Sequence, residues 1–359
     1  MIKKVSIFLA IAMTIAALTA CNSNNPGRTT IKDGDKTITI IEPEATAETD
    51  ELRVEKIDEY KDIRILDWQD EDRLLVSKKN SNVNKISGEG EEFYPNNLYI
   101  FDTKSGEYKI LREESANQLF AEFSPDKKHI FYKTNSEETA HGYIMDSQGQ
   151  KVVSVTGDRT IYVMAGKWVD NERVIYPDFG NGIYEGSISG ESVEVVNLGS
   201  ESANYVFKNG DNIYYLTSKL ELKKYNLVSK ETDVLDENVF KVFPSGDMNK
   251  FAYVKMTKDE KVELIVSDIS FSKKTLAEGL EISQAAWSPD NTRLVFSIKK
   301  EASEESGTYL SDLKSEKTSR ISLFNEIIGF SWSPSGKKIS VCRLDKDYNI
   351  LSNVIILNK

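Results

Sequence analysis

Side chains that could carry acid–base or metal chemistry are scarce in this sequence. Its 359 residues include two histidines, His129 and His141, and two cysteines, Cys21 and Cys342. Neither a Cys/His zinc pattern nor a Gly-x-Ser-x-Gly nucleophile motif occurs, and no glycine-rich phosphate-binding loop is found. We therefore predict no catalytic set and no cofactor, with His129 at the edge of a strand and His141 in a solvated loop.

One short segment carries the alternating oxygen ligands of a calcium-binding loop. Asp345, Asp347 and Asn349 occupy every second position. The glycine that such a loop requires next is Ile350, and the position of the bidentate glutamate is Ile356. We therefore interpret the segment as an acidic hairpin loop and predict no metal site.

The N-terminus is organised as an export signal. Lys3 and Lys4 precede an apolar stretch, residues 5–18, which is too short for a comfortable membrane span. The stretch ends in Leu18-Thr19-Ala20-Cys21, which resembles the lipobox of bacterial lipoproteins. The resemblance implies cleavage before Cys21 and attachment of lipid to its sulfur.

We accordingly predict a lipoprotein signal peptide at 1–20 and, at 21–50, the lipidated Cys21 followed by a flexible tether. The tether is rich in Asn, Thr, Ser and acidic residues, and only the segment Thr37 to Ile41 could pair as a strand. With Cys21 modified, Cys342 has no partner for an internal disulfide, and its place in an apolar run predicts a buried thiol.

An aromatic residue followed by a turn recurs along the rest of the chain. The clearest copies are Phe123-Ser124-Pro125-Asp126, Trp287-Ser288-Pro289-Asp290 and Trp332-Ser333-Pro334-Ser335, each followed by a β-rich run. Seven such anchors occur at a mean spacing of 44 residues: Trp68, Phe123, Trp168, Phe207, Phe243, Trp287 and Trp332. That spacing is typical of four-stranded propeller blades.

We predict an all-β fold over residues 51–359, a seven-bladed β-propeller of four-stranded antiparallel blades. The seventh unit stops after its third strand, so the alternating segment 52–57 is expected to supply the fourth strand and close the ring, with Thr37 to Ile41 as the competing candidate. The expected blades are 58–115, 116–159, 160–200, 201–237, 238–279, 280–323, and 324–359 together with 51–57.

These units resemble the TolB-type, WD-repeat-like β-propeller family, whose blades carry an aromatic-Ser-Pro-Asp-Gly turn. Units two, six and seven match well, but the family's terminal glycine is Lys127 in unit two and Asn291 in unit six. Propellers of this kind serve as scaffolds, as binding modules and occasionally as enzymes. Lyases on such propellers hold a metal with several histidines, and two histidines cannot make that cluster.

Loop length indicates where a ligand would bind. The connections between second and third strands emerge on one face, and they are expected to be long in units one (80–97), two (134–142) and six (299–307) and moderate in unit seven (344–351). The candidate contact residues on this arc are Glu91, Phe93, Tyr94, Glu304, Asp345 and Tyr348.

Composition excludes some classes of partner. Hydrophobic residues make up 39% and charged residues 29%, which fits a folded, soluble body, and the net charge of −11 argues against nucleic acid. We predict a monomeric, non-catalytic module that binds an envelope protein and is held on the extracytoplasmic face of a bacterial membrane through lipidated Cys21. The sorting residue Asn22 allows the outer membrane if there is one. Glycan binding, and a hydrolase or lyase using carboxylates on the long loops, are the alternatives.

Overall fold

The computed structural model describes residues 28–33, 36–41, 53–88, 90–136 and 139–358. The chain divides into two compact units, residues 1–51 and 52–359. In the first, β1 (Arg28–Asp33) and β2 (Lys36–Ile41) pair with each other as an antiparallel hairpin. The predicted tether therefore includes a hairpin, while the predicted signal peptide and Cys21 lie outside the described residues.

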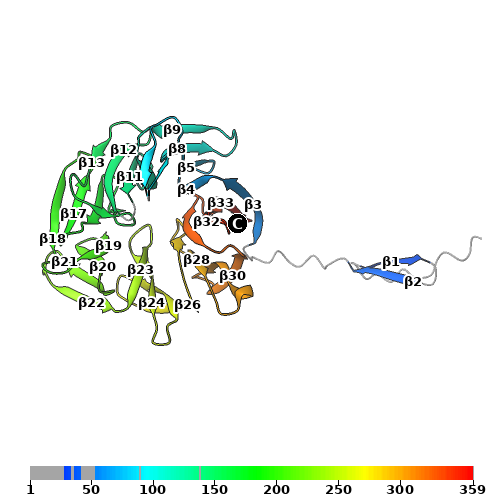
Figure 1. Ribbon diagram of the computed structural model, residues 1–359. Coiled ribbons are helices and arrows are strands. Elements are labelled where there is room, and N and C mark those ends of the chain that lie inside the picture. The colour runs from blue at the N-terminus through cyan, green and yellow to red at the C-terminus, as the bar shows by residue number, and fades with distance from the viewer. Residues whose placement is uncertain (1–27, 34–35, 42–52, 89, 137–138, 359) are drawn as a thin grey trace, which may run out of the picture. The chain divides into compact units, whose positions relative to one another are not determined.

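The second unit is a β-propeller of seven blades, each an antiparallel sheet, and almost no helix is present in its described part (Figure 1). The blades follow one another round the ring in chain order, and in each of the first six the strand that comes first in the sequence is innermost. The first three blades comprise β4 (Ile63–Trp68), β5 (Arg73–Lys79), β8 (Asn96–Asp102) and β9 (Tyr108–Arg112); β10 (Asn117–Phe123), β11 (His129–Ser136), β12 (Thr139–Asp146) and β13 (Val153–Ser154), with β14 (Ile161–Tyr162) also on β12; and β15 (Lys167–Trp168), β16 (Arg173–Pro177), β17 (Gly182–Ser187) and β18 (Ser192–Asn197).

The next three blades have the same order of strands. They comprise β19 (Ala203–Asn209), β20 (Asn212–Thr217), β21 (Leu222–Asn226) and β22 (Thr232–Asp236); β23 (Val239–Pro244), β24 (Lys250–Met256), β25 (Val262–Asp268) and β26 (Lys273–Gly279); and β27 (Ala285–Trp287), β28 (Arg293–Ile298), β29 (Gly307–Asp312) and β30 (Lys317–Ser322).

The seventh blade is built from both ends of the propeller. Its strands β31 (Ile327–Trp332), β32 (Lys338–Leu344) and β33 (Ile350–Leu357) are completed by β3 (Val54–Lys61), which pairs antiparallel with β33. The strand runs four residues beyond the expected 52–57, so residues 58–61 belong to blade seven and not to blade one. The competing segment Thr37 to Ile41 pairs with β1 instead.

The apolar runs of the second strands explain why the blades stack. Such a strand is covered on both faces, by the neighbouring blades, so its hydrophobic residues are continuous and not alternating. In β5, for example, Leu74, Leu75 and Val76 are all fully buried. The outermost strands are largely exposed, as in β30. The core is thus a series of apolar layers between blades.

Three of the anchor tryptophans join neighbouring blades. The indole Nε1 of Trp168 donates to the carbonyl of Glu122 (3.3 Å), that of Trp287 to Phe243 (2.9 Å) and that of Trp332 to Ala286 (3.1 Å), each acceptor lying in the preceding blade. Trp68, at the junction of blades seven and one, is different: its buried Nε1 has no partner among the described residues.

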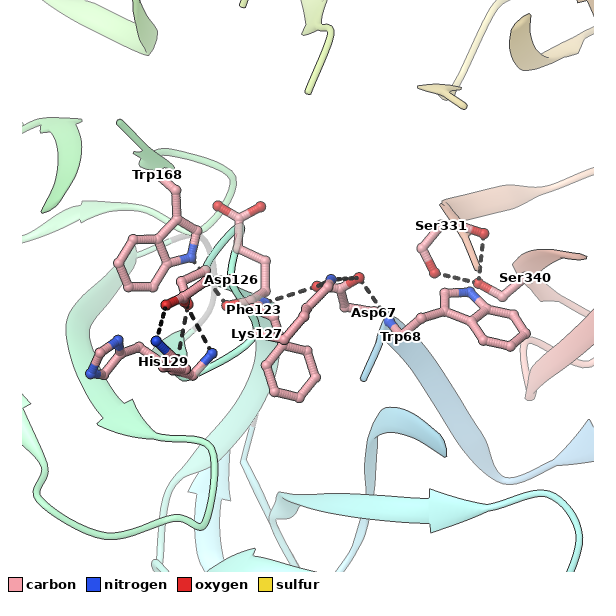
Figure 2. Close-up of polar contacts among 12 residues, drawn as sticks. Asp67, Trp68, Phe123, Asp126, Lys127, His129, Trp168, Ser331 and Ser340 are labelled. Carbon is pink, nitrogen blue, oxygen red and sulfur yellow. Dashed lines mark hydrogen bonds and ion pairs between the residues drawn. The ribbon is translucent and has the colours of Figure 1, made fainter. Parts of the chain in front are cut away.

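The carbonyl at the corresponding position has a different donor. In blades two and six the acceptor carbonyl belongs to the residue before the anchor, and in blade seven that residue is Ser331. Its carbonyl already accepts a hydrogen bond from Ser340 Oγ at 3.3 Å, and the two hydroxyls lie 2.5 Å apart (Figure 2).

This difference predicts unequal costs for the same substitution. Trp332→Phe removes a part-buried hydrogen bond and leaves the Ala286 carbonyl without its donor, which should cost about 1 kcal/mol more than Trp68→Phe, where no bond is lost. Thermal or urea unfolding of the two variants measures the difference. Equal destabilisation, or a larger loss for Trp68→Phe, would contradict this account.

The Ser-Pro turns have an architectural role. Ser124 Oγ donates to Asp126 Oδ1 (2.8 Å) and accepts the amide of His129 (3.0 Å), so it holds the hairpin between the first two strands. Ser288 repeats both bonds, and Lys127 and Asn291 adopt the left-handed backbone conformation that favours glycine, with φ of 60° and 54°.

Two of the predicted loops differ in the structure. Residues 134–142 do not form a long loop, because β11 and β12 pair as far as Ser136 and Thr139 and only residues 137–138 connect them. In blade seven, β33 begins at Ile350, so the connection is the short turn 345–349 and not 344–351. In blade one the connection 80–95 carries an extra hairpin of β6 (Ile86–Gly88) and β7 (Glu91–Phe93), and in blade six residues 299–306 include the 3₁₀ turn η1 (Ser303–Glu305).

Candidate functional site

The antiparallel blades give the propeller two different faces. We call the loop face the one formed by the connections from second to third strands and from each blade to the next. The turn face carries the Ser-Pro turns and the connections from third to fourth strands. All six predicted contact residues lie on the loop face, in blades one, six and seven.

Blade one places three of them on its extra hairpin. Phe93 pairs with Ile86 and is 37% exposed, and Glu91 is also exposed. Tyr94 is half-buried, with Lys85 Nζ 5.5 Å from its ring centroid, so one face of the ring is already occupied. The hairpin is held at its base by Asn80, whose amide nitrogen donates to Asn97 Oδ1 at 2.9 Å.

Blade six places Glu304 on an exposed turn beside a shallow pocket. The carbonyl of Glu304 accepts a hydrogen bond from Arg320, and Lys300 lies 3.5 Å from Glu305. The pocket has a volume of about 270 Å³ and lies between the connections of blades five and six. Its lining includes Lys261, Lys300, Leu280, Glu301 and Glu305.

In blade seven, the two candidate contact residues, Asp345 and Tyr348, differ in their surroundings. Asp345 Oδ1 accepts the amides of Asp347 (2.8 Å) and Asn349 (2.9 Å), so this carboxylate holds its own turn. These bonds from Asn349 and Asp347 lower the pKa of Asp345. Tyr348 projects from the same turn and is 82% exposed. Tyr348 is therefore free to meet a partner, whereas Asp345 is already engaged.

The structure does not gather the six residues into one cluster. Their contacts in the described part of the chain stay within their own blades. The loop face does carry exposed apolar side chains from several blades. Eight exposed large hydrophobic side chains lie in its connections or at the strand ends that meet them, against three on the turn face, Tyr108, Val228 and Ile269. The eight are Phe93, Met164, Phe179, Leu220, Met256, Leu280, Leu323 and Tyr348.

Sequence reasoning missed a charged cluster on the inner strands of blades one to three. Lys167 Nζ is 2.6 Å from Glu122 Oε2. Lys127 is 3.3 Å from Asp67, which also accepts the amide of Phe123 (Figure 2). Asp67, Glu122 and Lys167 each precede an anchor aromatic. The sequence signal that could have identified this cluster is a charged residue directly before the anchor aromatic in an otherwise apolar strand.

The histidines and Cys342 contribute no candidate chemistry. His129 begins β11, as expected, whereas His141 lies in β12 opposite Thr134 and not in a loop. Cys342 is buried in β32, as expected, and its burial raises the pKa of the thiol. Among the described residues, no group of three or more His, Cys, Asp or Glu side chains could hold a metal ion. No helix in that part is long and apolar enough to cross a membrane.

Comparison with known proteins supports the fold. No protein-family model matches the chain, and no curated protein matches its sequence. Among solved structures, an oligogalacturonate lyase in complex with manganese is similar at 12% identity, with a TM-score of 0.58, 92% of this chain covered and 96% of that one.

Two further structures show the same likeness. Oligogalacturonate lyase from Vibrio parahaemolyticus has 12% identity and a TM-score of 0.62, with 85% of this chain and 98% of that one covered. The Cps50 (Swd1) β-propeller domain of Myceliophteria thermophila has 10% identity and a TM-score of 0.56, with 85% of this chain and 100% of that one covered. At these identities the likeness concerns the propeller fold.

Proposed function

We propose that this chain is a lipid-anchored, TolB-like propeller of the bacterial cell envelope that binds a partner protein through its loop face. The observation that carries the proposal is the uneven distribution of exposed apolar side chains, eight on the loop face and three on the turn face. Large exposed apolar areas on a soluble surface are typical of protein interaction sites, and here the exposed apolar side chains are distributed round one face of the ring. The rigid blades would hold these side chains in fixed positions.

The anchor in this proposal comes from the N-terminal sequence. Lipidation of Cys21 would place the propeller on the extracytoplasmic face of a membrane, and of the outer membrane where a second one exists. A monomeric propeller linked through residues 22–52 could then reach a membrane-associated partner.

A glycan-binding role has less support from the same face. Sugar rings stack on open aromatic faces, but Lys85 covers one face of Tyr94 and Gly88 lies against the ring of Phe93. The lyase-like alternative takes its support from two structural neighbours that are oligogalacturonate lyases. One of them is in complex with manganese, and a corresponding group of ligands is absent from the described residues of this chain.

The test is affinity capture of the full-length protein from detergent-solubilised membranes of its own cells. The loop-face variant combines Phe93→Ser, Leu323→Ser and Tyr348→Ser, which change exposed side chains in neighbouring blades. The matched turn-face control combines Val228→Ser and Ile269→Ser. We expect a specific protein partner whose recovery falls about tenfold or more in the loop-face variant and is unchanged in the control.

Two results would overturn the proposal. One is that wild-type protein recovers no specific partner. The other is that the turn-face control loses the partner while the loop-face variant keeps it. If the wild type binds a polysaccharide and captures no protein, the glycan alternative would be favoured.

A further inference from the structure

The outermost strand of each blade pairs on one side only, so the N–H and C=O groups along its outer edge have no partner in the sheet. Charged residues, above all lysine, discourage another chain from pairing with such an edge. The outer strands of five blades each carry two or more charged residues, namely β3, β9, β22, β26 and β30. In blade two, β13 has two residues, and β14 pairs with a further part of β12.

Blade three is the exception to this pattern. Its outer strand β18 (Ser192–Asn197) contains three valines and one charged residue, Glu194. The Glu194 carboxylate accepts hydrogen bonds from the hydroxyl of Tyr184 (3.1 Å) and from the amide of Asn197 (2.9 Å). Tyr184 is the residue opposite Glu194 on β17, so these bonds hold the carboxylate over the face of the blade. The neighbouring Val193 is 58% exposed.

The outer edge of β18 is open to another strand. Among the described residues β17 is its only partner strand, and β18 lies at the rim of the ring (Figure 1). A register shift interrupts the pairing of β17 and β18, but the corresponding pairs of the other five blades with a full outer strand have one too. The shift therefore does not set β18 apart, whereas its low charge does. Valine is also among the residues that favour strands.

The charges beside this edge favour a basic partner. Glu191, directly before β18, is exposed, and so is Glu194. Two copies of β18 paired with each other would place the glutamates of both copies along the same short stretch, between chains that each have a net charge of −11. Lysine side chains on an added strand would instead lie opposite carboxylates.

We propose that the outer edge of β18 binds an extended, basic segment of a partner protein, which adds a fifth strand to blade three. Backbone hydrogen bonds would supply affinity, and lysines alternating with apolar residues would provide selectivity. This edge lies on the rim of the propeller and shares no residue with the loop-face variant, so the proposal does not depend on partner binding by the loop face.

The test uses the full-length protein and a short, fluorescently labelled peptide of alternating lysine and valine residues with both ends blocked. Fluorescence anisotropy should show saturable binding at one site. The first control is the same peptide with N-methyl groups on its two central residues, whose N–H groups point to opposite edges of a strand. This peptide keeps the charge but cannot pair, so we expect its binding to be about tenfold weaker or more.

Two exposed valines on neighbouring blades provide matched variants. Val193→Lys places a charge on β18 and should weaken peptide binding about tenfold or more, whereas Val193→Thr keeps a β-branched, uncharged side chain and should bind within about threefold of wild type. Val234→Lys makes the same change on β22, at a side chain that is 52% exposed, and should leave the affinity unchanged. Because both valines are exposed, we expect all three variants to fold.

Hydrogen exchange locates the bound strand. Addition of the peptide should slow amide exchange in residues 192–197 and leave exchange in residues 232–236 unchanged. The inference would be overturned by absence of binding, by equal binding of the N-methylated peptide, by unchanged affinity in Val193→Lys, or by an equal loss in Val193→Lys and Val234→Lys. Each of these failures leaves the loop-face proposal standing, because the capture experiment alters other side chains.

Discussion

A protein lacking residues 1–61 should lose the cooperative unfolding transition that a protein lacking residues 1–51 retains. The difference between the two is β3, the strand that completes blade seven. Its pairing with β33 continues from Val54 to Lys61, with one register shift. Without β3, the N–H and C=O groups along β33 would lose their partners, and the last blade would have an open edge.

The loss would also expose apolar surface. Val54 packs against the core of blade seven, and Tyr60 meets Phe101 of blade one edge to face, with ring centroids 5.3 Å apart. Next to β3, a hydrogen bond from Ser352 Oγ to the carbonyl of Ile63 (2.9 Å) joins β33 to β4. We expect a loss of at least about 5 kcal/mol, comparable with the whole stability of many domains.

Circular dichroism during heating compares the two truncations directly. The protein lacking 1–51 is the control, because those residues form a separate compact unit. A protein without β3 that unfolds at the same temperature as this control would show that the closing strand does not stabilise the ring.

Phe251→Ala should be the most damaging single core substitution that we can identify. Phe251 is fully buried between blades four and five. Its ring lies 5.6 Å from that of Phe207 and 5.8 Å from that of Tyr214, both in blade four, and 6.0 Å from that of Tyr253. Removing it would leave a cavity among several aromatic rings.

The expected loss for Phe251→Ala is about 3–5 kcal/mol, from lost transfer energy and from the cavity. Phe93→Ala is the matched control, since the same atoms are removed from a side chain that is partly exposed, and it should cost about 1 kcal/mol or less. Urea unfolding gives both values. A similar loss at the two positions would contradict the claim that the ring is held by packing between blades.

The repeat made the fold predictable from the sequence. The anchors such as Trp287 recur at blade spacing, and the truncated last unit required a strand from elsewhere. The alternation of apolar and polar residues is a local pattern, so the segment after residue 51 could be identified as a fourth strand. Its extension to Lys61 could not be, because the register with β33 depends on where the chain turns into β4.

Loop lengths were less predictable than strands. Residues 134–142 are polar and suggested a loop, yet they extend a hairpin, because backbone pairing between β11 and β12 tolerates polar side chains at its exposed end. Asp345 was predicted as a contact residue, but its carboxylate accepts the backbone amide two positions later in the chain and so stabilises its own turn.

The charged inner cluster could not be assembled from the sequence. Arg64 and Lys133 come from neighbouring blades and are brought to the same ring, that of Phe120, by the packing of blade one against blade two. Asp67, Glu122 and Lys167 were visible as charges in apolar runs, but their mutual distances were not.

Site-specific photo-crosslinking in living cells tests the central claim most directly. A photoreactive phenylalanine analogue would replace Tyr348 on the loop face in one strain and Val228 on the turn face in another; both positions are highly exposed. The account predicts that the analogue at position 348 crosslinks a specific protein of the cell envelope and that the analogue at 228 does not. Crosslinking of that protein from position 228 alone, or no protein adduct at 348, would contradict binding through the loop face.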